Sequence, residues 1–187
     1  MFDVLIRNGM IVDGLGNPAF PGDVAIQGDK IAAIGNLGEA EARAQIDAAG
    51  KIVCPGFVDC HSHSDQTILV NREASSSIYQ GVTTEIVGNC GLGYAPISAG
   101  SRKVMERMIG SICAGICVDW SGCDQFLDRI EEGTAINLGV LVGHGVLRRA
   151  VMGSADRAPT EDDMREMERL VAESLDAGGI GLSFGLE

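Results

Sequence analysis

The sequence contains no apolar run of about 18 residues, the length that a helix needs to cross a bilayer, so we expect no membrane-spanning segment. Basic residues are scarce: 14 Lys and Arg stand against 26 Asp and Glu, which gives a net charge of −12. Because nucleic acids and anionic membrane surfaces attract basic proteins, we expect neither as a partner. Aromatic residues make up only 4% of the chain, which predicts an aliphatic core.

The first residues, MFDVLIRNGM, also lack the basic segment and the long apolar segment of a secretory signal. Without such a signal, the six cysteines are expected to be thiols in a reducing compartment rather than a disulfide framework. We therefore expect a cytoplasmic protein.

Residues 1–54 contain short β-rich runs separated by Gly, Asn and Asp, which is typical of strands and hairpins. The QGD at 27–29 predicts a tight turn, after which KIAAIG pairs back on DVAIQ. We expect a small antiparallel sheet, one part of a small β-sandwich domain, without catalytic residues.

Residues 55–187 alternate apolar strands with helical segments. The predicted strands lie near 56–61, 82–88, 136–142 and 180–184. The predicted helices cover 67–80, 101–115, 123–133 and 160–179. This alternation predicts an α/β fold with a parallel sheet, and four such units are the first half of a (β/α)₈ barrel. A whole barrel takes about 250 residues, so we expect a truncated chain.

Two of the three histidines, His61 and His63, lie two residues apart in CPGFVDCHSHSD, residues 54–65. On an extended strand alternate side chains leave the same face, so both imidazoles would point the same way, in phase with Asp59 and Asp65. That arrangement suits a metal ion. The alternative is a pair of surface or helix-capping histidines, because H-x-H alone is a weak motif.

In a (β/α)₈ barrel the functional groups lie at the C-terminal ends of the strands. His61 and His63 follow the first predicted strand, Cys90 the second, His144 the third and Glu187 the fourth. Cys90, in VGNCG, is either a zinc ligand or a small buried apolar residue. His144 and Glu187 are candidates for substrate contact. The alternative for His144 is a hydrogen bond to a backbone carbonyl, and the alternative for Glu187 is exposure to solvent.

Three further cysteines lie close together in the sequence. Cys113 and Cys117 are four residues apart on a predicted helix, and Cys123 follows. No histidine or C-x-x-C accompanies them, so packed thiols are expected. The acidic residues of the helix that starts near Thr160 are expected to form a solvated face.

Several motifs together resemble a known family. PGFVDCHSHSD resembles the first-strand signature of the amidohydrolase superfamily. GVTTEIVGNCG followed by Ala95-Pro96, then VGHGVLRRAVMG and GLSFGLE, resemble the D-aminoacylase branch, the N-acyl-D-amino-acid deacylases. The resemblance runs nearly end to end. It implies a metal-dependent barrel and a small β-sandwich built from both chain termini, with residues 1–54 as its N-terminal part.

The resemblance also implies roles for individual residues. His61 and His63 match the first-strand metal ligands, and Cys90 matches the cysteine ligand of this branch. It further implies one or two Zn²⁺ ions and hydrolysis of the amide bond of N-acyl-D-amino acids. The family's other histidine ligands and its catalytic aspartate are expected beyond residue 187. We therefore expect no catalytic residue and no activity in this chain alone, with a neighbouring chain as a candidate partner that completes the barrel.

Two alternatives remain open. A cyclic-amide hydrolase related to dihydroorotase or hydantoinase would share the barrel, but those relatives are expected to use a lysine on a later strand where this chain has Cys90. A non-catalytic binding or assembly protein on the same barrel would not need His61, His63 and Cys90 together.

Overall fold

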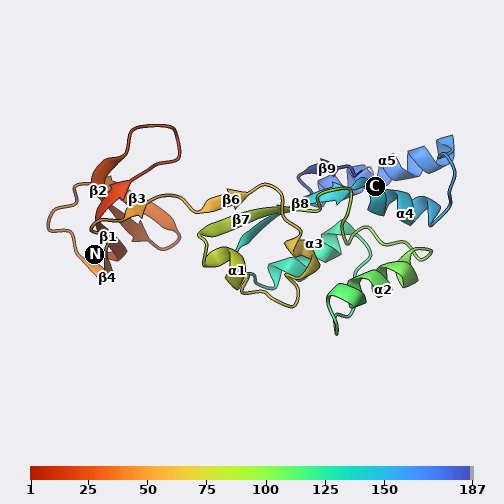
Figure 1. Cartoon of the computed structure of the whole chain (residues 1–187), viewed down its shortest axis with the longest axis horizontal. Helices are drawn as coiled ribbons and strands as arrows, with labels where there is room; N and C mark the ends of the chain where they lie inside the picture. The colour runs from red at the N-terminus through yellow and green to blue at the C-terminus, as the bar shows by residue number, and fades with distance from the viewer. Residues whose placement is uncertain (186–187) are drawn as a thin grey trace. The chain divides into compact units, whose positions relative to one another are not determined.

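The structure, a computed structural model, describes residues 1–185 and contains two compact units, Met1–Pro55 and a second unit from Gly56 onward (Figure 1). Among the described residues, no helix combines the length and the apolar character that a bilayer crossing requires.

The first unit is a five-stranded sheet. Its strands are β1 (Phe2–Ile11), β2 (Phe20–Gln27), β3 (Lys30–Gly35), β4 (Ala42–Asp47) and β5 (Ile52–Val53). They lie in the order β3-β2-β1-β4, and β5 pairs with the end of β1. The predicted hairpin is confirmed, because β2 and β3 are antiparallel and Gln27 pairs with Lys30 across the turn.

The expectation of a purely antiparallel sheet is wrong, because β4 and β5 run parallel to β1. A parallel neighbour requires a crossover connection, which here is the segment between β3 and β4. Arg7 on β1 holds this segment by donating to the carbonyl oxygens of Gly38 (3.0 Å) and Ala40 (2.6 Å). Turn residues in the sequence indicate where strands end, but they do not indicate whether the next strand pairs parallel or antiparallel.

The second unit alternates strands and helices. Its strands are β6 (Phe57–Asp59), β7 (Val82–Val87), β8 (Asn137–Gly143) and β9 (Gly181–Ser183). Its helices are the 3₁₀ turn η1 (Ser64–Gln66), α1 (Ser75–Ile78), α2 (Arg102–Ile112), α3 (Cys123–Glu131), α4 (His144–Met152) and α5 (Glu161–Asp176). The strands lie in the order β6-β7-β8-β9 and every pair is parallel. The prediction of four consecutive parallel strands with intervening helices, as in half of a (β/α)₈ barrel, is confirmed; within residues 1–185 no helix follows the fourth strand.

The main core of the second unit contains aromatic side chains at its centre, so the expectation of a wholly aliphatic core is wrong. Trp120 and Phe126 are both almost completely buried, with ring centroids 5.5 Å apart. The indole N–H of Trp120 donates to the carbonyl oxygen of Tyr94 (2.7 Å), which satisfies its polar atom. A low aromatic content does not exclude aromatic residues from the core.

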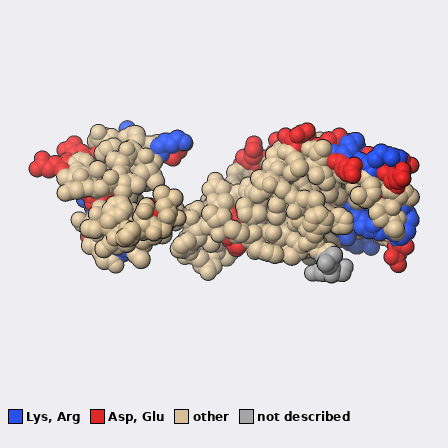
Figure 2. All heavy atoms as spheres, turned by 90° about the horizontal axis from the view of Figure 1, so that it is seen from above, with Lys and Arg blue, Asp and Glu red and all other residues tan. Residues whose placement is uncertain are grey.

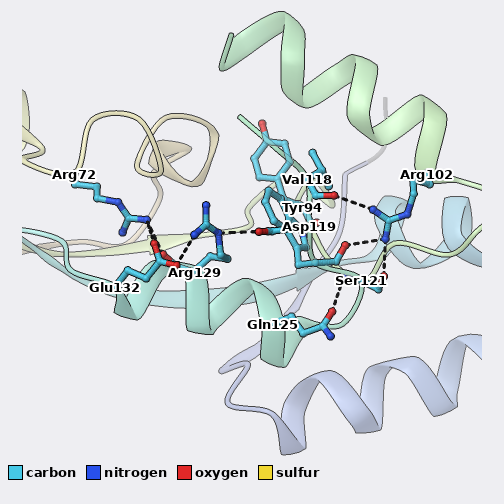
Figure 3. Close-up of polar contacts among 10 residues, drawn as sticks. Arg72, Tyr94, Arg102, Val118, Asp119, Ser121, Gln125, Arg129 and Glu132 are labelled. Carbon is cyan, nitrogen blue, oxygen red and sulfur yellow. Dashed lines mark hydrogen bonds and ion pairs between the residues drawn. The ribbon is translucent and has the colours of Figure 1, made fainter. Parts of the chain in front are cut away.

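Two arginines fix the segments around α3 (Figure 3). Arg102 donates to the carbonyl oxygens of Val118 (3.0 Å) and Trp120 (2.9 Å), before α3 begins. Arg72 donates to the carbonyl oxygen of Arg129 (2.9 Å), in the last turn of α3, where carbonyl groups have no partner within the helix. These contacts hold α3 at both ends.

The helix predicted over 67–80 is wrong, because the only regular helix in that range is the four-residue α1, and η1 ends at Gln66 before it. Ala74, just before α1, has φ of +43°, a left-handed conformation that interrupts a helix. The carbonyl oxygen of Arg72 accepts from the N–H of Ala135 (2.8 Å), far along the chain, instead of from the next helical turn. Tertiary contacts therefore override the local pattern.

Helices α2, α3 and α5 lie where they are predicted, whereas α4 is not predicted. Helix α4 begins at His144 directly after β8 ends at Gly143, so no intervening loop marks the change from strand to helix. Thr160 caps the start of α5, since the N–H of Asp163 donates to the Thr160 hydroxyl (3.2 Å). Figure 2 shows acidic and basic side chains interspersed at the end of the second unit that carries α4 and α5, as expected for a solvated face.

Candidate metal centre

The segment that carries His61 and His63 follows strand β6 and is not part of it. Strand β6 ends at Asp59, so strand alternation does not align the two imidazoles, and that explanation is wrong. The chain bends instead, and the Asp59 carboxylate accepts a hydrogen bond from the backbone N–H of His61 (3.0 Å). This bend brings the two rings to a centroid separation of 5.6 Å in an edge-to-face arrangement.

Cys90 lies in a tight turn after β7. Its φ is +57°, and the φ values of Gly88 and Gly91 are +75° and +70°, in the region that favours glycine. A Cβ atom at Gly88 would lie 2.1 Å from the carbonyl oxygen of Leu141 on β8, so the turn packs directly against that strand. In this position the Cys90 sulfur lies 3.3 Å from Nε2 of His61.

His61, His63 and Cys90 form one cluster. A ring nitrogen from each histidine and the sulfur of Cys90 all lie within 4.8 Å of one another. With Zn–S of about 2.3 Å and Zn–N of about 2.0–2.1 Å, ligand atoms around a tetrahedral zinc are about 3.3–3.6 Å apart. Within residues 1–185, Nδ1 of His63 is also buried without a hydrogen-bond partner. The residues present therefore fit a zinc ion.

Asn89 joins the two loops that form the cluster. Its buried side-chain amide donates to the carbonyl oxygens of Ser62 (3.1 Å) and Ile86 (2.8 Å). The backbone N–H of Ser62 donates to the same Ile86 oxygen (3.0 Å). Because Ser62 lies between His61 and His63, these bonds fix the histidine loop relative to the end of β7.

Ser183 fixes the opposite side of the Cys90 turn. Its hydroxyl, at the end of β9, accepts from the N–H of Gly91 (3.0 Å) and donates to the carbonyl oxygen of Gly88. The three strand ends β6, β7 and β9 thus contribute to one assembly. Ser183 cannot be identified from the sequence, because a single serine in GLSFG gives no signal of its own.

The two aspartates expected in phase with the histidines lie in different environments, so that expectation is wrong. Asp59 is exposed, whereas Asp65, in η1, is 4% exposed. Burial raises the pKa of the Asp65 carboxyl to about 6, while the charge of His63 and a hydrogen bond from the backbone of Gly88 act in the opposite direction. Asp65 is therefore a buried acid, two residues after His63 in the sequence.

The other candidates lie outside this cluster. His144 begins α4 at the end of β8, and its ring centroid lies 5.2 Å from that of Phe184. Glu187 lies outside the described residues. The structure therefore places His144 at the predicted strand end but does not bring it into the group of three potential ligands.

The three cysteines expected to be packed thiols differ from one another. Cys113 and Cys123 are buried, and burial raises the pKa of both thiols. Cys117 is exposed, so the expectation is wrong for this residue. Helix α2 ends at Ile112, which means that Cys113 and Cys117 do not share a helix face.

Comparison with known proteins gives the family. Residues 44–186 match the Amidohydrolase family. The chain belongs to the amidohydrolase family. The resemblance seen in the sequence motifs is thereby confirmed. D-aminoacylase from Alcaligenes xylosoxydans xylosoxydans is 36% identical over 185 residues, which cover 98% of this chain and 38% of that protein.

Solved structures of family members are similar along almost the whole chain. A D-aminoacylase studied for its binuclear metal center has a TM-score of 0.88 and 36% identity, covering 99% of this chain and 39% of its own. N-acyl-D-glutamate deacylase from Bordetella bronchiseptica, complexed with zinc and a phosphonate inhibitor, has a TM-score of 0.86 and 33% identity, with coverage of 99% and 38%. The amidohydrolase chain described here thus spans about two fifths of the length of these relatives.

Proposed function

We propose that this chain is the N-terminal part of a zinc-dependent deacylase that hydrolyses the amide bond of N-acyl-D-amino acids. The main support is the cluster in which the Cys90 sulfur lies 3.3 Å from Nε2 of His61, with a His63 ring nitrogen in the same group. The similarity to D-aminoacylase over 98% of the chain supports the substrate class.

His61 and His63 would bind the ion as neutral imidazoles and Cys90 as a thiolate, and none of the three would transfer a proton. One or two bound zinc ions would polarise the amide carbonyl and lower the pKa of a coordinated water to about 7. Three side chains are one short of a four-coordinate shell. The remaining ligands and the aspartate that moves the proton would come from protein beyond residue 187, or from a neighbouring chain.

The same proposal covers the substrate side and the compartment. His144, at the end of β8, and Glu187 are the residues of this chain that we propose to contact the N-acyl amino acid. All six cysteines are free thiols, which supports a reducing, cytoplasmic location.

A cyclic-amide hydrolase is the second candidate, and a non-catalytic barrel protein the third. The position of Cys90 within reach of both histidines supports the first proposal over the second, because cyclic-amide hydrolases are expected to use a lysine where this chain has Cys90. It also supports the first proposal over the third, because a protein without metal chemistry does not need the three ligands together.

The decisive experiment is a substrate comparison with a longer protein that includes these residues. We expect release of free amino acid from N-acetyl-D-amino acids, loss of this activity with a chelator and recovery with zinc. Dihydroorotate and hydantoin serve as the cyclic comparison. Opening of these rings without hydrolysis of linear amides would favour the second candidate, and no hydrolysis of either class by a zinc-loaded protein would favour the third.

A further inference from the structure

Glu85 is a buried carboxylate on β7 that forms no ion pair within residues 1–185. Only 2% of the surface of Glu85 is exposed to solvent. Burial of an ionised group is unfavourable unless charges or hydrogen bonds compensate for it. Within the described residues, the side-chain groups that donate hydrogen bonds to the Glu85 carboxylate are all hydroxyl groups. The positions of these donors therefore indicate which segments Glu85 holds.

Three serines donate to this carboxylate. Ser62 and Ser64 donate to Oε2, the former at 3.0 Å, and Ser77 on α1 donates to Oε1. Hydrogen bonds to an ionised acceptor are about twice as strong as those between neutral groups. One oxygen of Glu85 therefore holds the loop that follows β6, and the other oxygen holds α1.

The loop residues that Glu85 holds are the immediate neighbours of His63. Ser62 precedes it, Ser64 follows it, and the backbone N–H of Ser64 donates to the Ser62 hydroxyl (3.2 Å). Asn89 reaches the same loop only at the carbonyl oxygen of Ser62. Among these side chains, Glu85 is thus the one that contacts the loop on both sides of His63.

We propose that Glu85 is a positioning residue for the zinc site: through Ser62 and Ser64 it holds His63, and with it His61, in the orientation that faces Cys90. This inference rests on the proposed function and extends it to a residue that touches neither metal nor substrate. A loop held in its binding conformation loses less conformational freedom when the ion binds, which strengthens binding.

A purely structural role is the competing explanation. Glu85 would then serve to attach α1 to the sheet, and its contact with Ser77 would matter as much as its contacts with Ser62 and Ser64. The two carboxylate oxygens separate these explanations, because Ser77→Ala removes only the Oε1 contact and leaves the Oε2 contacts in place. Ser77→Ala is therefore the matched control.

The test is a cobalt(II) titration of the chain, followed by the thiolate-to-cobalt absorption that reports ligation by Cys90. We expect Glu85→Gln and the double variant Ser62→Ala/Ser64→Ala each to weaken cobalt binding by about 10- to 100-fold, the range for residues that support metal ligands. Ser77→Ala should bind cobalt within about 2-fold of the wild type, on the same scale. Circular dichroism checks that each variant is folded.

Cobalt affinities of Glu85→Gln and of the double serine variant equal to that of the wild type would overturn the inference. An equal loss in Ser77→Ala would do the same and assign Glu85 a structural role. If Glu85→Gln does not fold, the double serine variant alone decides. A wild-type chain without a thiolate band, or a band that survives in Cys90→Ser, would instead refute the zinc site itself, and both proposals would fail.

Discussion

The sulfur of Cys90 lies 3.3 Å from Nε2 of His61, although 29 residues separate them in the chain. The contact exists because β6 and β7 pair in parallel, with Asp59 beside Glu85, so that both loops leave the sheet at the same edge. Ligands drawn from two loops come together only when the strands have paired. Metal binding at such a site is therefore coupled to folding.

Removal of either proposed ligand should lower the zinc content. His61→Ala and Cys90→Ala each leave two of the three donor groups, so we expect less zinc per chain after equilibration with the ion, measured by mass spectrometry of the metal. Cys117→Ala is the matched control, because it removes an exposed thiol outside the cluster. Undiminished zinc in both ligand variants would contradict the assignment.

The turn that carries Cys90 should tolerate no side chain at Gly88. Gly88→Ala combines a φ of +75° with a Cβ atom 2.1 Å from the Leu141 oxygen, so we expect a loss of unfolding free energy above about 1–3 kcal/mol, the cost of the backbone strain alone. Gly110→Ala, in α2, is the control: no atom lies within 4 Å of its added Cβ, and it should gain about 0.5–1 kcal/mol. Denaturant unfolding measures both. Equal effects of the two substitutions would show that the turn is not constrained as described.

The start of α5 depends on Thr160. The substitution Thr160→Ala removes the oxygen that accepts from the N–H of Asp163, and we expect a loss of about 0.5–2 kcal/mol in unfolding free energy. Thr160→Ser retains the hydroxyl and should remain within a few tenths of a kcal/mol, roughly, of the wild type. Thermal unfolding followed by circular dichroism distinguishes the two. A serine variant as unstable as the alanine variant would exclude capping as the cause.

Asp163 should make folding sensitive to acid. Hydrogen bonds from Arg157 and from Thr160 hold the pKa of its carboxyl well below the usual value of 3.8. A group with a lowered pKa in the folded state stabilises the fold above its unfolded pKa. This contribution is lost progressively as the pH falls from the unfolded pKa toward the folded pKa, so the loss has begun by about pH 3. Between about pH 6 and about pH 3, Asp163→Asn should therefore lose less stability than the wild type.

The control for this pH dependence is Glu168→Gln, which removes one exposed carboxylate from the same helix. Glu168 forms no ion pair within the described part of the chain, and the variant should follow the wild-type pH curve. Urea unfolding at both pH values provides the comparison. Parallel curves for Asp163→Asn and the wild type would mean that the Arg157 contact contributes nothing in solution.

In the second unit the order and direction of the strands could be predicted from the sequence, because alternating apolar strands and amphipathic helices leave few topologies. In the first unit the parallel direction of β4 and β5 could not be predicted. The failures have identifiable causes. The turn at Ala74 and the distant partner of the Arg72 carbonyl interrupt a segment whose local pattern is helical. The start of α4 at His144 is not marked in the sequence, because no loop separates it from the end of β8 at Gly143.

The candidate site, too, could be predicted from the sequence only in part. The residue types in H-x-H and VGNCG predict the three members of the cluster, but the reason given for their alignment is wrong, because His61 and His63 lie beyond the strand. The contacts that hold the cluster come from Asn89, Ser183 and Glu85, each through partners distant in sequence. No local pattern reports such contacts.

Strand β6 is an edge of the four-stranded sheet in the described residues, and its residues Phe57 and Val58 are 58% and 57% exposed. An apolar edge strand offers unpaired N–H and C=O groups to another chain. We therefore expect the 187-residue chain to self-associate or to require a neighbouring chain, in a concentration-dependent manner measurable by sedimentation velocity. Val58→Lys places a charge on the edge and should reduce this association.

Val104→Lys is the matched control for that experiment, because Val104 is 40% exposed on α2, away from the sheet edge. Both variants change the net charge equally, so only an edge effect can separate them. We expect Val104→Lys to associate like the wild type and Val58→Lys to associate less. An equal reduction in both would assign the association to charge rather than to the edge. A wild-type chain that sediments as a stable monomer at all concentrations would show that β6 is protected in solution.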